Sequence, residues 1–332
     1  MIINMNLLFL LPPETAHSLA LNTLKFLHKF KFKKKIPYKP CTVMGLDFPN
    51  PVGLAAGLDK NAEYIDCLAG LGFGFIEVGT VTPEAQPGNP KPRLFRLRKN
   101  QAIINRMGFN NHGIDRLLKN VKAARFNGIL GINIGKNFNT PIEEAIDDYL
   151  IGLEKAYPFA DYITVNISSP NTPGLRQLQQ ADQLDSMLKA LKEAQQELAS
   201  KHNKYVPLVV KIAPDLTEEE VKDIANTLLA SKIDGVIATN TTLSRDNLIR
   251  ETHINKTGGL SGAPLFTNST NIIKQLNAIL KGKIPIIAVG GIMTAADAEA
   301  KLEAGASLVQ IYTGLIYKGP ELIDEIKKML DK

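Results

Sequence analysis

Residues 208–239, LVVKIAPDLTEEEVKDIANTLLASKIDGVIAT, begin and end with short apolar segments separated by a more polar stretch. The two outer segments, 208–212 and 235–239, are rich in β-branched and apolar residues, which is typical of parallel strands buried on both faces. Thr217 is followed three residues later by Glu220, a capping-box pattern that predicts a helix over 217–231. The whole stretch therefore predicts a strand, a helix and a second, parallel strand.

The same alternation continues through most of the chain. Helical periodicity also occupies residues 180–202 and 295–304. The segments that we expect to form strands are residues 52–56, 75–78, 129–134, 162–167, 208–212, 235–239, 284–289 and 308–312. Eight strands alternating with helices predict an α/β protein with a (β/α)8 barrel. A doubly wound open sheet is the alternative, but polar clusters after nearly every strand favour the barrel over a fold with one crevice.

The composition is that of an ordinary enzyme: 332 residues, of which 44% are hydrophobic and 22% charged. The net charge of +6 comes entirely from residues 1–40, which hold seven lysines and one acid. A nucleic-acid-binding protein would spread its basic residues over a face, so we expect no nucleic acid partner. Two cysteines, Cys41 and Cys67, allow a single bridge but no disulfide framework, which favours a reducing compartment.

The amino-terminal segment predicts two short helices. The second begins at Pro13, and its apolar residues recur at helical spacing, namely Ala16, Leu19, Ala20, Leu24 and Leu27. In residues 29–35, KFKFKKK, lysine alternates with phenylalanine, a pattern suited to the boundary between lipid tails and anionic headgroups. A solvated basic linker is the alternative interpretation. We expect residues 1–40 to be a helical segment in contact with a membrane, and residues 41–332 to be the barrel.

No apolar run approaches the roughly 20 residues of a membrane-spanning helix. The run at residues 7–11 stops at Pro12-Pro13, and no basic residue precedes it as in a secretory signal. We therefore expect a peripheral protein on the cytoplasmic side of a cell membrane, in contact with its anionic surface.

Small, hydroxyl-bearing or amide residues follow the expected strands, where a (β/α)8 barrel places its active site. They include Gly57, Thr80, Asn133, Asn166, Thr239, Asn240, Gly290, Gly291, Thr313 and Gly314. The glycines after the last two strands suit a phosphate group. Lys60 and Lys211, also at strand ends, are candidates for a Schiff base or for a fixed cation beside an anionic ring. The amides of Asn105, Asn133, Asn166, Asn171 and Asn240 favour recognition of a planar heterocycle.

Five motifs then resemble those of the quinone-linked class of dihydroorotate dehydrogenases. They are 53–60 (GLAAGLDK), 105–111 (NRMGFNN), 166–176 (NISSPNTPGLR), 257–262 (TGGLSG) and 289–292 (VGGI). The resemblance implies oxidation of (S)-dihydroorotate to orotate in pyrimidine biosynthesis. One non-covalent FMN per chain would take the hydride, and a membrane quinone would take the electrons. Ser169 would be the base that removes the C5 proton, and we hypothesise that Thr172 or a water passes the proton on, because a serine hydroxyl is a weak base.

The same resemblance implies the binding residues. Those for the substrate are Lys60, Asn105, Arg106, Met107, Gly108, Phe109, Asn171, Asn240 and Thr241. Those for FMN are Ala55, Ala56, Gly57, Lys60, Thr80, Asn133, Asn166, Lys211, Thr239, Gly262, Gly291, Tyr312 and Thr313. In this setting Lys211 would stabilise the charge of the reduced flavin rather than form a Schiff base. No metal is expected, and we expect a monomer.

Two features indicate the quinone-linked class. Soluble relatives use a cysteine base, whereas neither cysteine of this chain lies near Ser169. Those relatives also lack the amino-terminal extension. In the quinone-linked class this extension is a helical funnel for the quinone, so the resemblance implies that residues 1–40 are the quinone-access segment and residues 41–332 the FMN-binding catalytic domain. His17, Arg96 and Tyr312 match positions that line the quinone funnel in relatives, although His17 also fits a surface residue and Arg96 an ion-pair partner. Three other functions remain as alternatives: a soluble FMN enzyme using fumarate or NAD, an aldolase acting through Lys211, and a barrel that only stores flavin.

Overall fold

The computed structural model describes residues 8–29, 39–246 and 248–331. Eight parallel strands close into a barrel, in the order β10-β11-β12-β14-β15-β3-β4-β9. Their bounds are β3 Val52–Leu54, β4 Phe75–Val81, β9 Ile129–Ile134, β10 Tyr162–Asn166, β11 Leu208–Ile212, β12 Gly235–Ala238, β14 Ile286–Val289 and β15 Leu308–Ile311. The expected (β/α)8 barrel is therefore confirmed, and closure excludes the doubly wound sheet.

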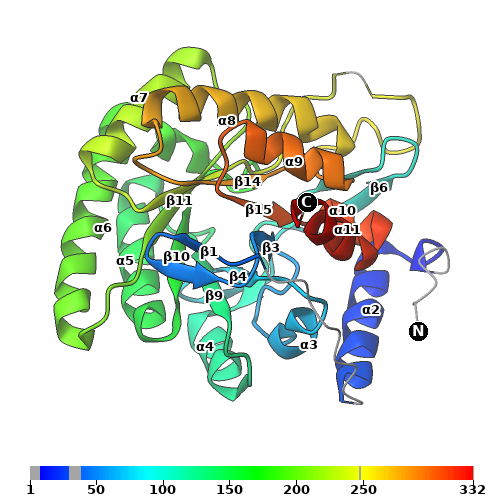
Figure 1. The fold of residues 1–332 in the computed structure, drawn as a ribbon, viewed down its shortest axis with the longest axis horizontal. Coiled ribbons are helices and arrows are strands. Elements are labelled where there is room, and N and C mark those ends of the chain that lie inside the picture. The colour runs from blue at the N-terminus through cyan, green and yellow to red at the C-terminus, as the bar shows by residue number, and fades with distance from the viewer. Residues whose placement is uncertain (1–7, 30–38, 247, 332) are drawn as a thin grey trace.

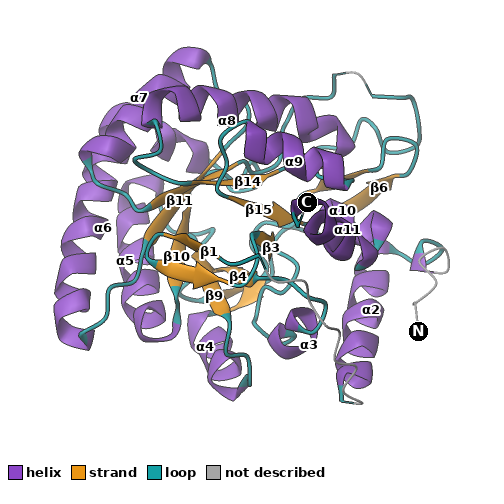
Figure 2. Cartoon of the chain, viewed as in Figure 1, coloured by secondary structure: helices purple, strands orange, loops and turns teal. Residues whose placement is uncertain are grey.

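Helices surround the barrel, as Figure 2 shows. They are α3 Ile65–Ala69, α4 Ile114–Ala123, α5 Ala145–Ala156, α6 Ala181–His202, α7 Glu218–Ala230, α8 Phe266–Leu280, α9 Ala295–Glu303, α10 Thr313–Lys318 and α11 Glu321–Leu330. The predicted capping box opens α7, because Thr217 accepts from the backbone N–H of Glu220 while the Glu220 side chain accepts from that of Thr217. Short 3-10 turns occur at Ile142–Glu144, Tyr157–Phe159, Leu175–Gln179 and Ala263–Leu265.

Aromatic side chains fill the amino-terminal end of the barrel. The hairpin of β1 (Cys41–Val43) and β2 (Leu46–Phe48) places Phe48 edge-on against Phe75, with ring centroids 5.1 Å apart. Phe75 in turn contacts Tyr162 at 6.3 Å. Glycine is required beside these rings, because a Cβ on Gly53 would lie 2.2 Å from Phe75, and one on Gly131 would lie 2.2 Å from Tyr162. With Val209, Ile237, Ile287 and Leu308 these rings form an apolar plug that closes one end of the barrel, so a ligand has access only at the other end.

Short antiparallel strands stand outside the barrel. One sheet has the order β13-β7-β6, from β6 Leu94–Leu97, β7 Ala102–Asn105 and β13 Gly259–Gly262. The other pairs β5 Ala85–Gln86 with β8 Asn111–His112. The sequence pattern did not predict these strands, because segments of two to four residues carry little periodicity and β7 pairs with a strand far along the chain. They place Asn105 opposite Gly259 at the edge of the site.

Helix α2, Pro13–His28, begins at the predicted proline and packs against α3 and β6 (Figure 1). Glu14 joins it to the loop before β6 through Arg93 at 2.7 Å and Lys91 at 3.0 Å. Most of the first expected helix, and most of the lysine–phenylalanine stretch at 29–35, lie outside the described residues. In the described part of the chain, no helix is both long and apolar enough to cross a membrane.

Glu14 offers a test of how α2 is attached. Burial raises the pKa of Glu14, but the hydrogen bonds and positive charges of Arg93 and Lys91 outweigh it, so the pKa lies below its ordinary value. A carboxylate with a depressed folded pKa stabilises the fold above its unfolded pKa, and this contribution is lost as the pH falls through the folded value.

We expect Glu14→Gln to weaken the docking of α2 by about 1–2 kcal/mol, between the values for exposed and buried ion pairs. Hydrogen exchange of the α2 amides should accelerate roughly tenfold near neutral pH, while the barrel strands stay protected. After correction for intrinsic exchange, acidification should remove the difference between wild type and variant. Equal protection of α2 in the two proteins near neutral pH would contradict this role of Glu14.

Candidate active site

A cavity of about 140 Å³ opens where the barrel strands end, and we call it the polar cavity because amide, hydroxyl and ammonium groups line it. Most of the residues expected to bind substrate or FMN line it. They are Ala55, Ala56, Gly57, Lys60, Thr80, Asn105, Met107, Gly108, Phe109, Asn166, Ser169, Asn171, Lys211, Thr239, Asn240, Thr241, Gly262, Gly291, Tyr312 and Thr313. Parallel strands bring these residues together because their carboxyl ends meet at one rim of the barrel.

Two expected residues do not line this cavity. The guanidinium of Arg106 lies outside it, donating to the carbonyl of Pro92 at 2.9 Å and to the hydroxyl of Thr257 at 3.0 Å. Asn133 lies beneath the cavity floor, where its amide oxygen accepts from Thr80 at 2.5 Å. Asn133 thus orients a residue that lines the cavity, whereas Arg106 does not line it, although its neighbours Asn105 and Met107 do.

The amides at the strand ends hold one another in fixed orientations. Asn166 donates to the hydroxyl of Thr80 at 2.8 Å, and its oxygen accepts from Ser168 at 3.0 Å. Asn240 donates to the same Ser168 hydroxyl at 3.0 Å. Across the cavity, Asn171 donates to Asn105 at 3.2 Å. The donor and acceptor pattern around the cavity is therefore set before a ligand arrives, which suits a rigid heterocycle.

Two lysines supply positive charge. Lys211 is 5% exposed, and none of the described residues accepts a hydrogen bond from its ammonium or forms an ion pair with it. Burial lowers its pKa, and the negative charge of Glu77 opposes that effect. Lys60 donates to the carbonyl of Gly57 at 2.7 Å, and burial followed by the charge of Arg93 lowers its pKa to about 8. Because an unpaired buried ammonium is costly, the cavity fits an anionic or electron-rich ligand.

A buried carboxylate beneath the cavity was missed by the sequence analysis. Glu77 is fully buried and accepts hydrogen bonds from Asn133 at 2.7 Å, Tyr162 at 3.0 Å and Gln310 at 2.8 Å. Glu77 and Gln310 lie within apolar strand segments, and nothing local marks them. The available signal was the two-residue period of a strand. Glu77 follows Phe75 by two residues and Gln310 follows Leu308 by two, so both point into the barrel above the apolar plug, as Lys211 does.

Three glycines shape the end of the cavity nearest the last two strands. Gly262, Gly290 and Gly291 have φ values of 100°, 120° and 77°, which other residues rarely adopt. A Cβ on Gly291 would lie 2.3 Å from the backbone of Phe266, and one on Gly262 would lie 2.2 Å from the carbonyl of Gln101. Barrels commonly bind phosphate at this position, and these glycines leave the backbone open to a phosphate group.

Ser169 faces the cavity from the loop after β10 and is 5% exposed. Its hydroxyl accepts from the backbone N–H of Asn171 at 3.2 Å. No described histidine or carboxylate hydrogen-bonds to it. Thr172 is also buried in this loop, but no hydrogen bond joins its hydroxyl to Ser169 in the described structure.

A second cavity, of about 490 Å³, lies between α2 and the barrel and is mainly apolar. His17, Arg96 and Tyr312 all line it. Burial and the charge of Lys60 lower the pKa of His17 to about 4, which makes it neutral at pH 7. Arg96 has no carboxylate partner within the described residues; it donates to the carbonyls of Leu8, at 3.1 Å, and Leu11. Tyr312 borders both cavities and thus forms part of the wall between them.

Comparisons with known proteins agree with this geometry. The dihydroorotate dehydrogenase family matches residues 40–332. Dihydroorotate dehydrogenase (quinone) of Nitrosospira multiformis is 61% identical over 98% of this chain and 94% of that protein. The enzyme of the same name from Acinetobacter baylyi is 61% identical over 96% of each. The crystal structure of DHODH from Eimeria tenella in complex with ferulenol has a TM-score of 0.89 and 42% identity, covering 96% of this chain and 90% of that one. The chain therefore belongs to the dihydroorotate dehydrogenase family.

Proposed function

We propose that this chain oxidises (S)-dihydroorotate to orotate, a step of pyrimidine biosynthesis, at the polar cavity, using FMN and a membrane quinone. The observation that carries the proposal is the pair of cavities with opposite character that share Tyr312. The polar cavity suits a charged pyrimidine and a flavin, and the apolar cavity suits a lipid-like acceptor. The relatives named for quinone support this acceptor over fumarate or NAD.

The residues of the polar cavity would divide the work. Lys60 provides a cation for the carboxylate of the substrate, and the amides of Asn105, Asn171 and Asn240 hold the edges of its ring. Ser169 takes the C5 proton and, since no described acidic or imidazole group contacts its hydroxyl, needs a water or Thr172 to carry the proton away. Ser169 and Thr172 are each 5% exposed, so the proton transfer is largely kept from bulk water.

FMN would be held by other residues of the same cavity. The glycines at 262 and 291 would receive its phosphate, and Thr80, Asn166 and Thr239 would meet the polar edge of its ring. When bound, FMN supplies an acceptor for the hydride of the substrate that can later release electrons to a quinone. Lys211 would supply a positive charge where an electron-rich ring would lie, and the negative charge of Glu77, which opposes the lowering of its pKa by burial, favours this fixed cation over a Schiff base.

The apolar cavity would admit the quinone from a membrane surface. Leu10, Leu19 and Phe26 are 76%, 49% and 58% exposed on the amino-terminal segment beside this cavity. Exposed apolar side chains next to a lysine-rich segment favour peripheral attachment to an anionic surface, which we place on the cytoplasmic side. The division at residue 40 and the monomeric state remain predictions.

The first test is an anaerobic titration of the purified protein with dihydroorotate. We expect the visible flavin absorbance to bleach with about one equivalent of substrate per chain, as a bound two-electron acceptor requires. Addition of a soluble quinone should restore the absorbance, whereas fumarate and NAD should not. A colourless protein that takes up no FMN would refute the proposal, and recovery with fumarate or NAD alone would favour the soluble class.

Ser169→Ala tests the base. Loss of a general base slows a proton transfer by about 10²–10⁴-fold, so flavin reduction by dihydroorotate should slow by that factor. FMN content and reoxidation by quinone should stay near wild type, because among the described residues the hydroxyl is hydrogen-bonded only to a backbone N–H of its own loop. Stopped-flow absorbance measures both half-reactions. Flavin reduction at the wild-type rate would remove Ser169 from the mechanism.

Ala20→Trp tests the apolar cavity. Ala20 lines it from α2, so an indole should obstruct it and slow reoxidation by quinone by roughly tenfold or more, as expected for overpacking. Reduction by dihydroorotate should be unchanged. Ser18→Trp is the matched control, because Ser18 is exposed on the same helix and does not line the cavity. Equal reoxidation rates in the two variants would argue against this cavity as the quinone site.

A further inference from the structure

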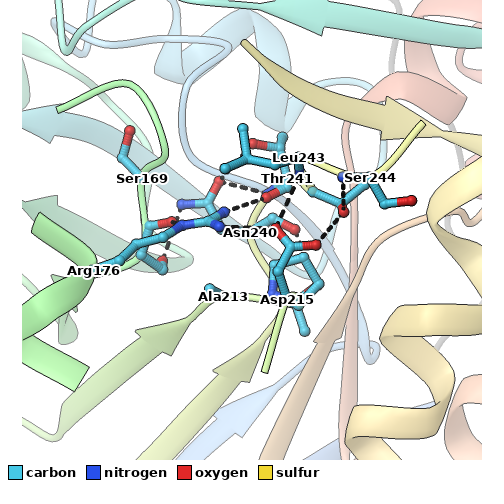
Figure 3. Close-up of polar contacts among 12 residues, drawn as sticks. Ser169, Arg176, Ala213, Asp215, Asn240, Thr241, Leu243 and Ser244 are labelled. Atoms are coloured by element: carbon cyan, nitrogen blue, oxygen red, sulfur yellow. Dashed lines mark hydrogen bonds and ion pairs between the residues drawn. The ribbon is translucent and has the colours of Figure 1, made fainter. Parts of the chain in front are cut away.

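Arg176 connects three loops at the mouth of the barrel, as Figure 3 shows. It lies in the 3-10 turn Leu175–Gln179, at the end of the loop that carries Ser169. Its guanidinium donates from Nε to the carbonyl of Ser168 at 3.1 Å, from Nη1 to Asp215 at 2.8 Å and from Nη2 to the carbonyl of Thr241 at 2.8 Å. The three acceptors belong to the loops after β10, β11 and β12.

The bond to Ser168 acts on the base most directly. The carbonyl of Ser168 belongs to the peptide unit that continues into Ser169, and a peptide unit is planar and rigid. Fixing that oxygen therefore restricts the position from which the Ser169 side chain extends. The same bond joins the two ends of the loop 168–176, so this segment is closed on itself.

The other two bonds connect residues 168–176, here called the base loop because it carries Ser169, to the loop after β12. We call the latter the substrate loop because it carries Asn240 and Thr241. Thr241, whose carbonyl accepts from Arg176, lies beside Asn240 and lines the polar cavity. Asp215 reaches the same loop, because its carboxylate accepts from the hydroxyl of Thr242 and from the backbone N–H of Leu243 at 2.9 Å. Arg176 and Asp215 thus hold the base loop and the substrate loop at a fixed separation.

The ion pair is shielded enough to be stronger than a surface pair. The side chains of Arg176 and Asp215 are only 22% and 23% exposed. A guanidinium presents its donors as a rigid planar fork, and here all three nitrogens are used. Lysine, a point charge on a flexible stem, cannot reproduce three separated contacts.

We propose that Arg176 and Asp215 are positioning residues for proton removal. They set its rate by keeping the loop that carries Ser169 at a fixed separation from the loop that carries Asn240 and Thr241. Neither residue lines the cavity, so both act through the loops and not by touching the substrate. The inference rests on the proposed function, in which Ser169 is the base. A misplacement of about 1 Å at a reacting group costs roughly 10²-fold in rate, which gives the expected size of the effect.

The test measures the two half-reactions of the holoenzyme separately. For Arg176→Met we expect anaerobic flavin reduction at saturating dihydroorotate to slow by roughly 10²-fold, with smaller losses in Arg176→Lys and Asp215→Asn. Reoxidation by a soluble quinone should stay within about twofold, since the apolar cavity is formed elsewhere. The isotope effect of substrate deuterated at C5 should increase, because proton removal becomes slower relative to the other steps.

Lys192→Met is the matched control. Lys192 pairs with Asp234 at 3.4 Å, with side chains 14% and 17% exposed, so this pair is at least as shielded as Arg176–Asp215. It lies at the amino-terminal end of the barrel, where Asp234 also accepts from the backbone N–H of Leu208 at the start of β11. We expect this variant to lose thermal stability without any change in flavin reduction or isotope effect.

The outcomes separate the possible errors. If dihydroorotate does not bleach the wild-type protein, the proposed function is wrong and the inference falls with it. If the wild type bleaches and Arg176→Met reduces at the same rate, only the inference is wrong. Equal slowing of both half-reactions, or slowing in Lys192→Met as well, would show that Arg176 supports the fold in general. Arg176→Lys keeps the positive charge and Asp215→Asn keeps the side-chain size, so these two variants decide the question if Arg176→Met does not fold.

Discussion

The closed ring of backbone hydrogen bonds between parallel strands is the constraint on which the rest of this structure depends. Closure removes both sheet edges and brings the carboxyl ends of all the barrel strands to one rim. It also gives every strand an inner and an outer face with a period of two residues. Along β4 and β11, Phe75 and Val209 therefore belong to the apolar plug, and Glu77 and Lys211 belong to the polar layer above it.

This layering creates a site whose charges are arranged before any ligand binds. Glu77 and Lys211 face the same interior without forming a direct ion pair, and each is fully or nearly fully removed from water. The plug beneath them leaves only the rim open to ligands. Because these groups are fixed, they need no costly reorganisation during a reaction. Lys211 therefore favours a ligand that gains negative charge at the rim.

The amino-terminal helix adds a second environment to the same rim. Its inner face and the residues around Tyr312 enclose apolar space directly beside the polar cavity. The Glu14–Arg93 pair holds this helix, and Arg93 also donates to the carbonyls of Pro87 and Asn89 at 2.6 Å and 3.0 Å. The backbone N–H of Asn89 in turn donates to the carbonyl of Met107, which lines the polar cavity. The attachment of α2 and the wall of this cavity therefore depend on the same arginine.

The barrel strands and α7 were predictable because their signals are local. Buried parallel strands form short apolar runs, and a capping box needs only two residues three positions apart. Strand ends differed from prediction by up to three residues. The strand predicted at residues 75–78 continues to Val81 as β4, because Gly79 and Thr80 carry no apolar signal. The antiparallel sheet of β6, β7 and β13 was not predicted, since its strands are short and their pairing depends on distant segments.

The sequence alone determined the family resemblance, the type of fold and most residues at the rim, because these follow from motifs and strand ends that are contiguous in the chain. Only the tertiary structure decided which side chains face the cavity. It turned the guanidinium of Arg106 outward and placed Asn133 beneath the floor. It also joined Arg176 to Ser168, Asp215 and Thr241. Such contacts arise from the closure of the barrel, which brings distant loops within hydrogen-bonding distance and leaves no local trace in the sequence.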